Sequence, residues 1–313
     1  MRNRPRSSRF HCAIAVLAVA ASFGCSGAGS GPVGPEPVSS AANSQVEIRG
    51  SVVDQVTGAP IAGVRVSTAG ASAWTEADGR FVLLSTSGTH VTLSGAGYYD
   101  RVASLAGSAG RYELVPRTFD MGAFNDVARD HSAGTLRWLS SPAVYVDVRA
   151  HSLAAGATVP AEWVEQVAAL APQFVSAWTG GALSARSVTV GSNPPAPGTS
   201  GTLVILFDED SARYPSATSA GTATPSSDAR GVITSATVRL RFSRLTGASA
   251  GISRQAVLGH ELGHALGLSH MDGATASMMA AVIRTPELTA FDRAAGALLY
   301  SRLPGTRADD RES

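Results

Sequence analysis

The stretch His260-Glu261-Leu262-Gly263-His264-Ala265-Leu266-Gly267-Leu268-Ser269-His270 decides how this chain is interpreted. Its fixed positions read H-E-x-x-H-x-x-G-x-x-H. Residues four apart share one face of a helix, so the imidazoles of His260 and His264 can bind one metal ion. Gly267 tolerates the positive φ that ends a helix, and the returning chain can then bring in His270. Three protein ligands leave a fourth position open, which is typical of a catalytic zinc site.

Glu261 follows the first histidine and is placed to reach a water molecule at the metal rather than the metal itself. Such a carboxylate can act as the general base of a hydrolase. The simplest alternative is a polar helix that matches by coincidence. With only seven histidines in 313 residues, a chance match at all five fixed positions is rare. A glutamate as third ligand is the competing arrangement, and His270 at this spacing disfavours it.

The N-terminus has the features of an export signal. Four arginines precede any acidic residue, namely Arg2, Arg4, Arg6 and Arg9. The apolar run that follows, residues 13–21, is too short to span a bilayer as a stable helix. This pattern predicts a secretory signal peptide over residues 1–25, the alternative being a buried core helix.

Cys25 is a candidate lipidation site. It follows Ser22-Phe23-Gly24, which resembles a bacterial lipoprotein box except that Ser22 stands where Leu is usual. We expect either lipid attachment at Cys25, in a lipoprotein of the cell surface, outer membrane or periplasm, or secretion into the medium. Cys12 would leave with the signal peptide, so the two cysteines of the chain exclude a disulfide framework.

Composition and charge argue against one class of function, nucleic-acid binding. The chain is 44% hydrophobic and 16% charged, with room for about two domains. A net charge of +1 and the lack of a basic stripe argue against a nucleic-acid partner. All the basic residues are arginines, which suggests a GC-rich bacterial genome.

Residues 26–44 are rich in Gly, Ser, Pro and Ala without periodicity, which predicts a flexible linker.

Residues 45–116 contain short alternating stretches separated by turn residues, which predicts a small all-β sandwich. The sequence of this segment resembles the carboxypeptidase regulatory-like domain, which is a transthyretin-like sandwich. The matching positions are Gly50-x-Val52-x-Asp54, Thr57-Gly58-x-Pro60-Ile61-x-Gly63-Val64-x-Val66, Thr75-x-x-Asp78-Gly79-x-Phe81 and Gly97-Tyr98. The resemblance implies a spacer or adhesion module without catalytic residues.

Residues 117–304 have an α/β pattern. Buried strands are expected near residues 143–148, 187–190 and 203–207, with a helix from about 161 to 178. A short strand at 220–224, stopped by Pro225, and a half-buried strand at 233–242 precede the motif helix, which Ser253 can cap. Asp208-Glu209-Asp210 could ligate calcium, although a solvated loop explains these carboxylates without an ion.

The motif at 260–270 and the later Ser277-Met278-Met279 together resemble the metzincin metallopeptidases, most nearly their matrixin-like bacterial members. The resemblance implies a tight turn with a methionine beneath three zinc-bound imidazoles. Met279 is the expected residue and Met278 the alternative. Some family members use a tyrosine soon after this turn, but residues 280–299 contain none, and Tyr300 is expected in the core.

Residues 288–300 resemble the closing helix of the same family, and residues 305–313 are expected to be a polar tail. The implied fold is a five-stranded mixed sheet with an active-site helix. The strand at 220–224 would be the edge to which an extended substrate adds.

The sequence therefore predicts a Zn²⁺-dependent endopeptidase, with Glu261 as catalytic base and a protein or peptide as substrate. It is expected to be a monomer, secreted or tethered to a membrane by its lipid. The alternative is an inactive surface adhesion or binding lipoprotein on the same scaffold. The intact His260, Glu261, His264, Gly267 and His270 favour the enzyme.

Overall fold

A computed structural model describes residues 46–85, 88–105, 109–129, 134–152, 158–216, 218–245, 253–271, 275–307 and 309–312. The predicted signal peptide, Cys25 and the linker at 26–44 lie outside these residues. Contacts within the chain separate Met1–Ala42 from a compact unit, Asn43–Ser313, to which all elements below belong. In the described part, no helix is both long enough and apolar enough to cross a membrane.

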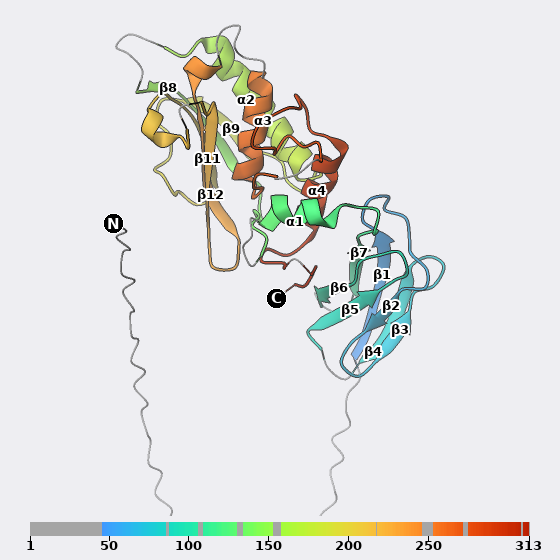
Figure 1. The fold of residues 1–313 in the computed structure, drawn as a ribbon. Helices are drawn as coiled ribbons and strands as arrows, with labels where there is room; N and C mark the ends of the chain where they lie inside the picture. The colour runs from blue at the N-terminus through green and yellow to red at the C-terminus, as the bar shows by residue number, and fades with distance from the viewer. Residues whose placement is uncertain are drawn as a thin grey trace, which may run out of the picture. The chain divides into compact units, whose positions relative to one another are not determined.

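The N-terminal β region, residues 46–114, consists of two sheets that share one hydrophobic core (Figure 1). Its strands are β1 (Val46–Asp54), β2 (Arg65–Ser67), β3 (Ser72–Trp74), β4 (Arg80–Ser85), β5 (His90–Ser94), β6 (Arg101–Ser104) and β7 (Ala109–Leu114). One sheet has the order β4-β1-β7 and the other β3-β2-β5-β6. Val52 of the first sheet and Val66 of the second are fully buried in that core. Strand β6 lies at the edge of its sheet, next to β5 only.

The C-terminal part of the unit is built on a five-stranded mixed sheet of order β11-β12-β10-β8-β9. Its strands are β8 (Ala143–His151), β9 (Ser187–Gly191), β10 (Thr202–Asp208), β11 (Gly221–Ser227) and β12 (Ile233–Leu240). Four strands are parallel, and β11 pairs with β12 in the antiparallel direction. The central strand β10 is apolar from Leu203 to Phe207, as expected for a strand covered on both faces.

Strand β11 corrects one expectation from the sequence. Pro225 was expected to stop this strand, yet β11 continues past it to Ser227. Proline cannot donate to a neighbouring strand, but β11 is an edge strand, where this loss is tolerated. The available edge is therefore seven residues long.

Among the described residues of this part, four α-helices and two short 3₁₀ helices accompany the sheet. They are α1 (Met121–Arg129), η1 (Ser211–Arg213), α2 (Ala161–Trp178), η2 (Phe242–Arg244), α3 (Arg254–Ala265) and α4 (Ala290–Ser301). The side chain of Ser253 accepts a hydrogen bond from Ala256 N, so it caps α3 as expected. Helix α2 also lies where its apolar periodicity predicts it. Helix α1 was not predicted, although Asp120 caps it by accepting from Ala123 N.

Part of the segment expected to be a polar tail is packed against the rest of the unit. Thr306, Asp310 and Glu312 are buried, with at most 5% of each exposed. Arg302, just after α4, is 1% exposed. Polar composition therefore does not mean solvent exposure here, because these side chains find charged and backbone partners inside the fold.

Candidate active site

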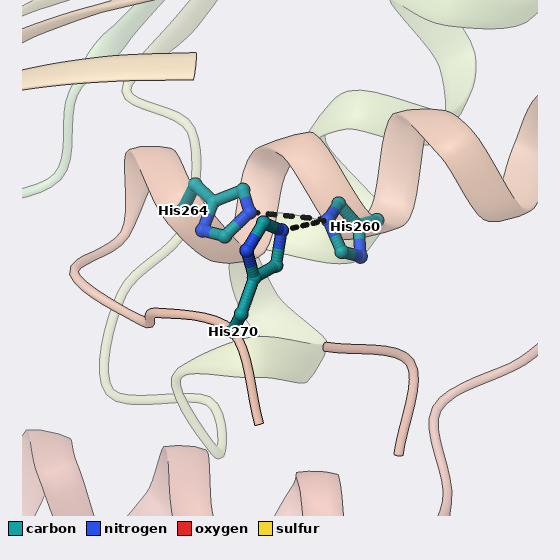
Figure 2. Close-up of side chains that lie close together, drawn as sticks. All are labelled: His260, His264 and His270. Carbon is teal, nitrogen blue, oxygen red and sulfur yellow. Dashed lines mark hydrogen bonds between the residues drawn. The ribbon is translucent and has the colours of Figure 1, made fainter. Parts of the chain in front are cut away.

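Helix α3 carries two of the three predicted metal ligands, His260 and His264, one turn apart on the same face (Figure 2). The indole of Trp178 donates a hydrogen bond from Nε1 to Gly259 O (2.8 Å), immediately before the first histidine. This contact ties α3 to the end of α2. The helix that presents the ligands is therefore anchored in the core and not at the surface.

The turn at Gly267 sends the chain back toward the helix. Gly267 has a φ of +101°, and a Cβ there would collide with the backbone oxygen of Leu136. Two buried aromatic side chains bind the carbonyls just before the turn: Trp138 Nε1 donates to Ala265 O (3.0 Å), and Tyr300 OH donates to Leu266 O (2.9 Å). These bonds satisfy carbonyl groups that the end of a helix leaves without partners. Tyr300 thus has a structural role in the core.

His270 lies on a short segment that is held at both ends. On one side, Ser269 N donates to Val127 O of α1 (2.6 Å). On the other, Met271 N donates to Met279 O (2.9 Å). The third ligand is thus positioned by elements from two distant parts of the sequence.

The three imidazoles converge. His260 Nε2 lies 3.1 Å from His264 Nε2 and 3.3 Å from His270 Nε2 (Figure 2). His260 Nδ1 donates to Met278 O, and His264 Nδ1 donates to Leu268 O, each at 2.7 Å. Because a carbonyl oxygen can only accept, these bonds put the ring proton on Nδ1 and leave the Nε2 lone pairs facing one another.

Facing lone pairs repel unless a cation lies between them. Tetrahedral nitrogen ligands 2.0–2.1 Å from Zn²⁺ are separated by about 3.3 Å, which matches the spacing of these histidines. Across the described residues, this trio is the group of His, Cys, Asp or Glu side chains that could hold a metal ion. The donor set therefore fits zinc.

Burial keeps the imidazoles of His260 and His264 neutral. Burial is the main cause that lowers the pKa of His260 to about 4 and that of His264 to about 3. The neighbouring histidines act in the same direction, and the hydrogen bonds to Met278 O and Leu268 O oppose it. Neutral imidazole is the form that binds a metal.

Glu261 is buried beside the ligands, and its Oε2 has no hydrogen-bond partner among the described residues. Burial raises the pKa of its carboxyl group to about 8. The carboxylate lies against the first residue of β11, since a Cβ built on Gly221 would come within 2.5 Å of Glu261 Oε1. An unpartnered buried oxygen is costly, and such costs are tolerated at functional sites.

The turn at residues 277–279 packs beneath α3. Met278 and Met279 are fully buried, and their sulfur atoms lie against Gly259 and Gly263 of the helix. A Cβ on Gly259 would lie 2.7 Å from Met278 Sδ. The two glycines are four residues apart and so form one bare strip on α3, which lets both methionines approach.

Asp292 of α4 holds this turn in place. Its carboxylate accepts from Met278 N (2.9 Å) and Thr289 N (2.8 Å), and also from the hydroxyl of Ser277. Asp292 is 1% exposed. It therefore acts both as a cap of α4 and as an anchor for the peptide whose carbonyl orients His260.

A cleft of about 860 Å³ opens onto the three histidines and Glu261. Its lining includes residues 221–223 of β11 and residues 281–283. Strand β11 pairs only with β12, so its other edge has no neighbouring strand in the described sheet. The site is thus a groove beside an available strand edge.

The carboxylates at 208–210 point to different partners. Asp208 lies 3.6 Å from Arg239, and Asp210 accepts from Ala212 N (3.0 Å). Glu209 accepts from Ser243 N (2.7 Å) and lies near Arg241. These oxygens are engaged with arginine and backbone groups rather than gathered around one point.

The remaining histidines lie apart from this cluster. His151 Nε2 lies 3.0 Å from Asp147, and His90 Nδ1 lies 2.9 Å from the hydroxyl of its neighbour Thr89. His131 and His11 lie outside the described residues.

A comparison with protein families matches residues 184–301 to the Matrixin family of peptidases. This match supports a metzincin-like peptidase domain. The matched segment contains the three histidines, Glu261, the turn at 277–279 and β11. Zinc is the metal that matrixins use, and the metal-binding trio lies within the matrixin-like segment.

Two other comparisons add no argument. None of the curated proteins matches the chain. Among solved structures, a chain of a type II cohesin–X-dockerin complex from Acetivibrio cellulolyticus, a C-terminal interface mutant, is 23% identical over 22% of this chain and 51% of that one. The chain thus spans about half the length of this neighbour, and the TM-score is 0.17.

Several residues that shape the site were not predicted. Gly259 and Gly263 could have been found from their spacing of four in the motif helix. Asp292 follows Thr289 by three residues, which is the spacing of a helix-capping pair, but its bond to Met278 leaves no trace in the sequence. Gly221 gives no signal in the sequence, because its partner Glu261 is 40 residues away.

Proposed function

We propose that this chain is a zinc-dependent endopeptidase in which Glu261 is the general base. The observation that carries this proposal is the convergence of three Nε2 atoms beside a buried carboxylate with an unpartnered oxygen. In His260 and His264 the ring proton is fixed on Nδ1 by a carbonyl oxygen. The matrixin match over residues 184–301 supports the same reaction class. His260, His264 and His270 would hold the metal.

Each residue has a role in peptide hydrolysis. Zinc, when bound, supplies Lewis-acid activation of the scissile carbonyl and of water. Glu261 takes a proton of the attacking water and then delivers it to the leaving nitrogen, so that water and peptide bond are converted into a carboxylic acid and an amine, which end as carboxylate and ammonium at neutral pH. Met278 O and Leu268 O keep His260 and His264 in the orientation that ligation needs.

An extended peptide is the substrate that fits the groove. We propose that it lies along the open edge of β11 and bonds with the backbone of that strand, as in β-strand addition. Gly221 at the start of β11 touches Glu261, so a peptide held on this edge would pass directly before the catalytic base. This arrangement favours unfolded or flexible protein segments over compact folded ones.

The test compares casein cleavage and zinc content in the wild type and three variants. Glu261→Ala is expected to keep about one zinc per chain while losing cleavage by a factor of about 10³ or more, in the range reported for central catalytic groups. His264→Ala is expected to lose both zinc and cleavage. Glu165→Ala, an exposed glutamate on α2, is the matched control and should leave both unchanged. A zinc-loaded wild type with no Glu261-dependent cleavage would favour the inactive adhesion protein.

We further propose that the chain is exported and held on a membrane through lipid at Cys25. The basic N-terminus, the short apolar run and Gly24-Cys25 support this location. The linker and the N-terminal β region, which we propose to be a transthyretin-like spacer, would then separate the peptidase from the membrane. In cells, Cys25→Ser should move the protein from the membrane fraction to the soluble fraction, and equal membrane retention would contradict lipidation.

A further inference from the structure

Residues 302–307 and 309–312, called here the C-terminal clasp, extend the edge of the N-terminal β region. Val102 N of β6 donates to Asp310 O (3.2 Å), and Glu312 N donates back to Val102 O (2.9 Å). Val102 and Arg311 form a parallel bridge. The clasp therefore covers the outer side of the edge strand β6.

Two buried ion pairs fix the clasp. Arg101 of β6 donates to Glu312 (2.7 Å), and their side chains are 7% and 5% exposed. Arg302 donates twice to Asp310 (2.8 and 2.9 Å), in the paired geometry that suits guanidinium and carboxylate. Glu312 also accepts from Ser104 N (2.8 Å). Charges buried in this way need their partners, so the clasp has one favoured position.

The same segment binds the end of α1. Arg129, the last residue of α1, is 4% exposed and donates from Nε to Thr306 O (3.1 Å). The guanidinium also stacks on Phe124 of the same helix, 5.0 Å from the ring centre. Thr135 N donates to Thr306 O (3.1 Å), and Gly305 N donates to Thr135 O (2.8 Å). The clasp thus holds the chain on both sides of residues 130–133.

Helix α1 in turn holds the third metal ligand. Val127 O, two residues before Arg129, accepts from Ser269 N, and His270 is the next residue. A continuous series of contacts therefore runs from β6 through Glu312, Thr306, Arg129 and Val127 to the segment of His270. Hydrogen bonds join β6 to Glu312, Thr306 to Arg129, and Val127 to Ser269. The backbone of the clasp joins Thr306 to Glu312, and the backbone of α1 joins Val127 to Arg129.

We propose that the C-terminal clasp positions His270 for metal binding. It does so by fixing α1 between the N-terminal β region and the C-terminal part of the unit, which carries the five-stranded sheet. Glu312 and Arg129 are then positioning residues, although neither touches the metal site ligands. This inference rests on the proposed zinc site. It makes the N-terminal β region part of the support of that site rather than only a spacer.

The experiment measures two quantities on the full chain: the dissociation constant for zinc, by competition with a chelator, and hydrogen exchange of the Ser269 amide in metal-free protein. The variants are Glu312→Gln, which keeps the shape of the side chain, and Arg129→Gln. Both are expected to weaken zinc binding by about 2- to 30-fold, the usual range for coupling through a packed network, and to speed exchange at Ser269. The Arg129 variant also removes a positive charge near the cleft, which alone would strengthen zinc binding. Weaker zinc binding by the Arg129 variant would therefore result from the displacement of His270 and not from the lost charge.

Asp309→Asn is the matched control, since it breaks an exposed ion pair with Arg311 within the same segment. It should change neither quantity. If the Glu312 and Arg129 variants stay folded and bind zinc and protect Ser269 as the wild type does, the clasp proposal is wrong. If the wild type itself binds no zinc, the proposed function fails, and exchange at Ser269 still tests the clasp separately.

Discussion

The carboxylate of Asp292 accepts a hydrogen bond from the backbone N–H of Met278 at 2.9 Å. The carbonyl of the same Met278 accepts from His260 Nδ1 at 2.7 Å. A side chain of the last helix thus orients a metal ligand of the motif helix through one residue of the intervening turn. The ligand set depends on this second layer of contacts as well as on the motif.

Asp292→Asn should weaken zinc binding by about 10- to 100-fold, the usual effect of losing a group that supports a metal ligand. The reason is that an amide cannot accept from Ser277, Met278 N and Thr289 N as a carboxylate does. Thr289→Ala is the control, because it removes the Thr289 side-chain cap on Asp292 N, at a cost of about 1 kcal/mol, while Met278 keeps its partner. Chelator competition on both variants measures the effect, and equal zinc affinity in the two would refute the role of Asp292.

Gly221→Ala should reduce peptide cleavage by about 10²-fold with zinc still bound, because a misplacement of about 1 Å at a catalytic group costs this much. The new Cβ would overlap Glu261 Oε1 and push the carboxylate from its place. Steady-state kinetics and zinc analysis measure the two quantities. Gly70→Ala, at a glycine with open space around it, should leave cleavage unchanged, and an equally active Gly221→Ala would mean that Glu261 can move without cost.

The pair of Arg302 and Asp310 should make stability depend on pH in the acid range. Burial alone raises the pKa of Asp310, but the charge and hydrogen bonds of Arg302, with the charges of Arg101 and Arg129, outweigh it and lower the pKa below its ordinary value of 3.8. A lowered pKa contributes stability that is complete above the unfolded value and is lost as the pH falls through the folded value. Urea unfolding from about pH 6 down to about pH 3 should therefore show a steeper loss for the wild type than for Asp310→Asn.

That variant also separates charge from backbone conformation. Asp310 has a φ of +54°, and asparagine tolerates this left-handed region as aspartate does. The Asn variant should thus be less stable at neutral pH, and its difference from the wild type should narrow as the pH falls. Parallel curves for the two proteins would show that Asp310 does not titrate in this range.

Tyr300→Phe should lower the free energy of unfolding by about 1–3 kcal/mol, because Leu266 O is left buried without its donor. The folded fraction should keep a kcat close to that of the wild type, since Tyr300 OH is already bound to that carbonyl. Chemical unfolding and initial-rate measurements check the two parts. A variant with unchanged stability and a greatly reduced kcat would instead make Tyr300 a donor to the reaction.

Much of the fold could be predicted from local patterns. Helix α2 follows from apolar residues at intervals of three to four, and the start of α3 follows from the capping serine Ser253. The sheet has five strands and is mixed, as the metzincin resemblance implied. The end of β11 was mispredicted at Pro225. A proline stops a central strand but is tolerated in an edge strand, and the sequence pattern does not tell which of the two a strand is.

The candidate site was predictable where chemistry and spacing coincide in one short stretch, and not where distant segments meet. The spacing within residues 260–270 predicts that His260, His264 and His270 can converge, and the structure brings them together. Helix α1 was missed because it is short and follows no long periodic pattern, yet Val127 supports the third histidine. The polar composition of residues 305–313 hid two buried carboxylates. Glu312 pairs with the distant Arg101, and Asp310 pairs with the nearby Arg302, but composition does not reveal that either pair is buried.

The bond between Arg101 and Glu312 joins residues 211 positions apart in the chain. Contacts between such distant residues carry a large closure entropy and form slowly. A polypeptide that leaves the ribosome from its N-terminus cannot close this contact until residue 312 has emerged, after all three histidines. Under the clasp proposal, the proposed zinc site would therefore reach its full affinity only after Glu312 has bound to β6.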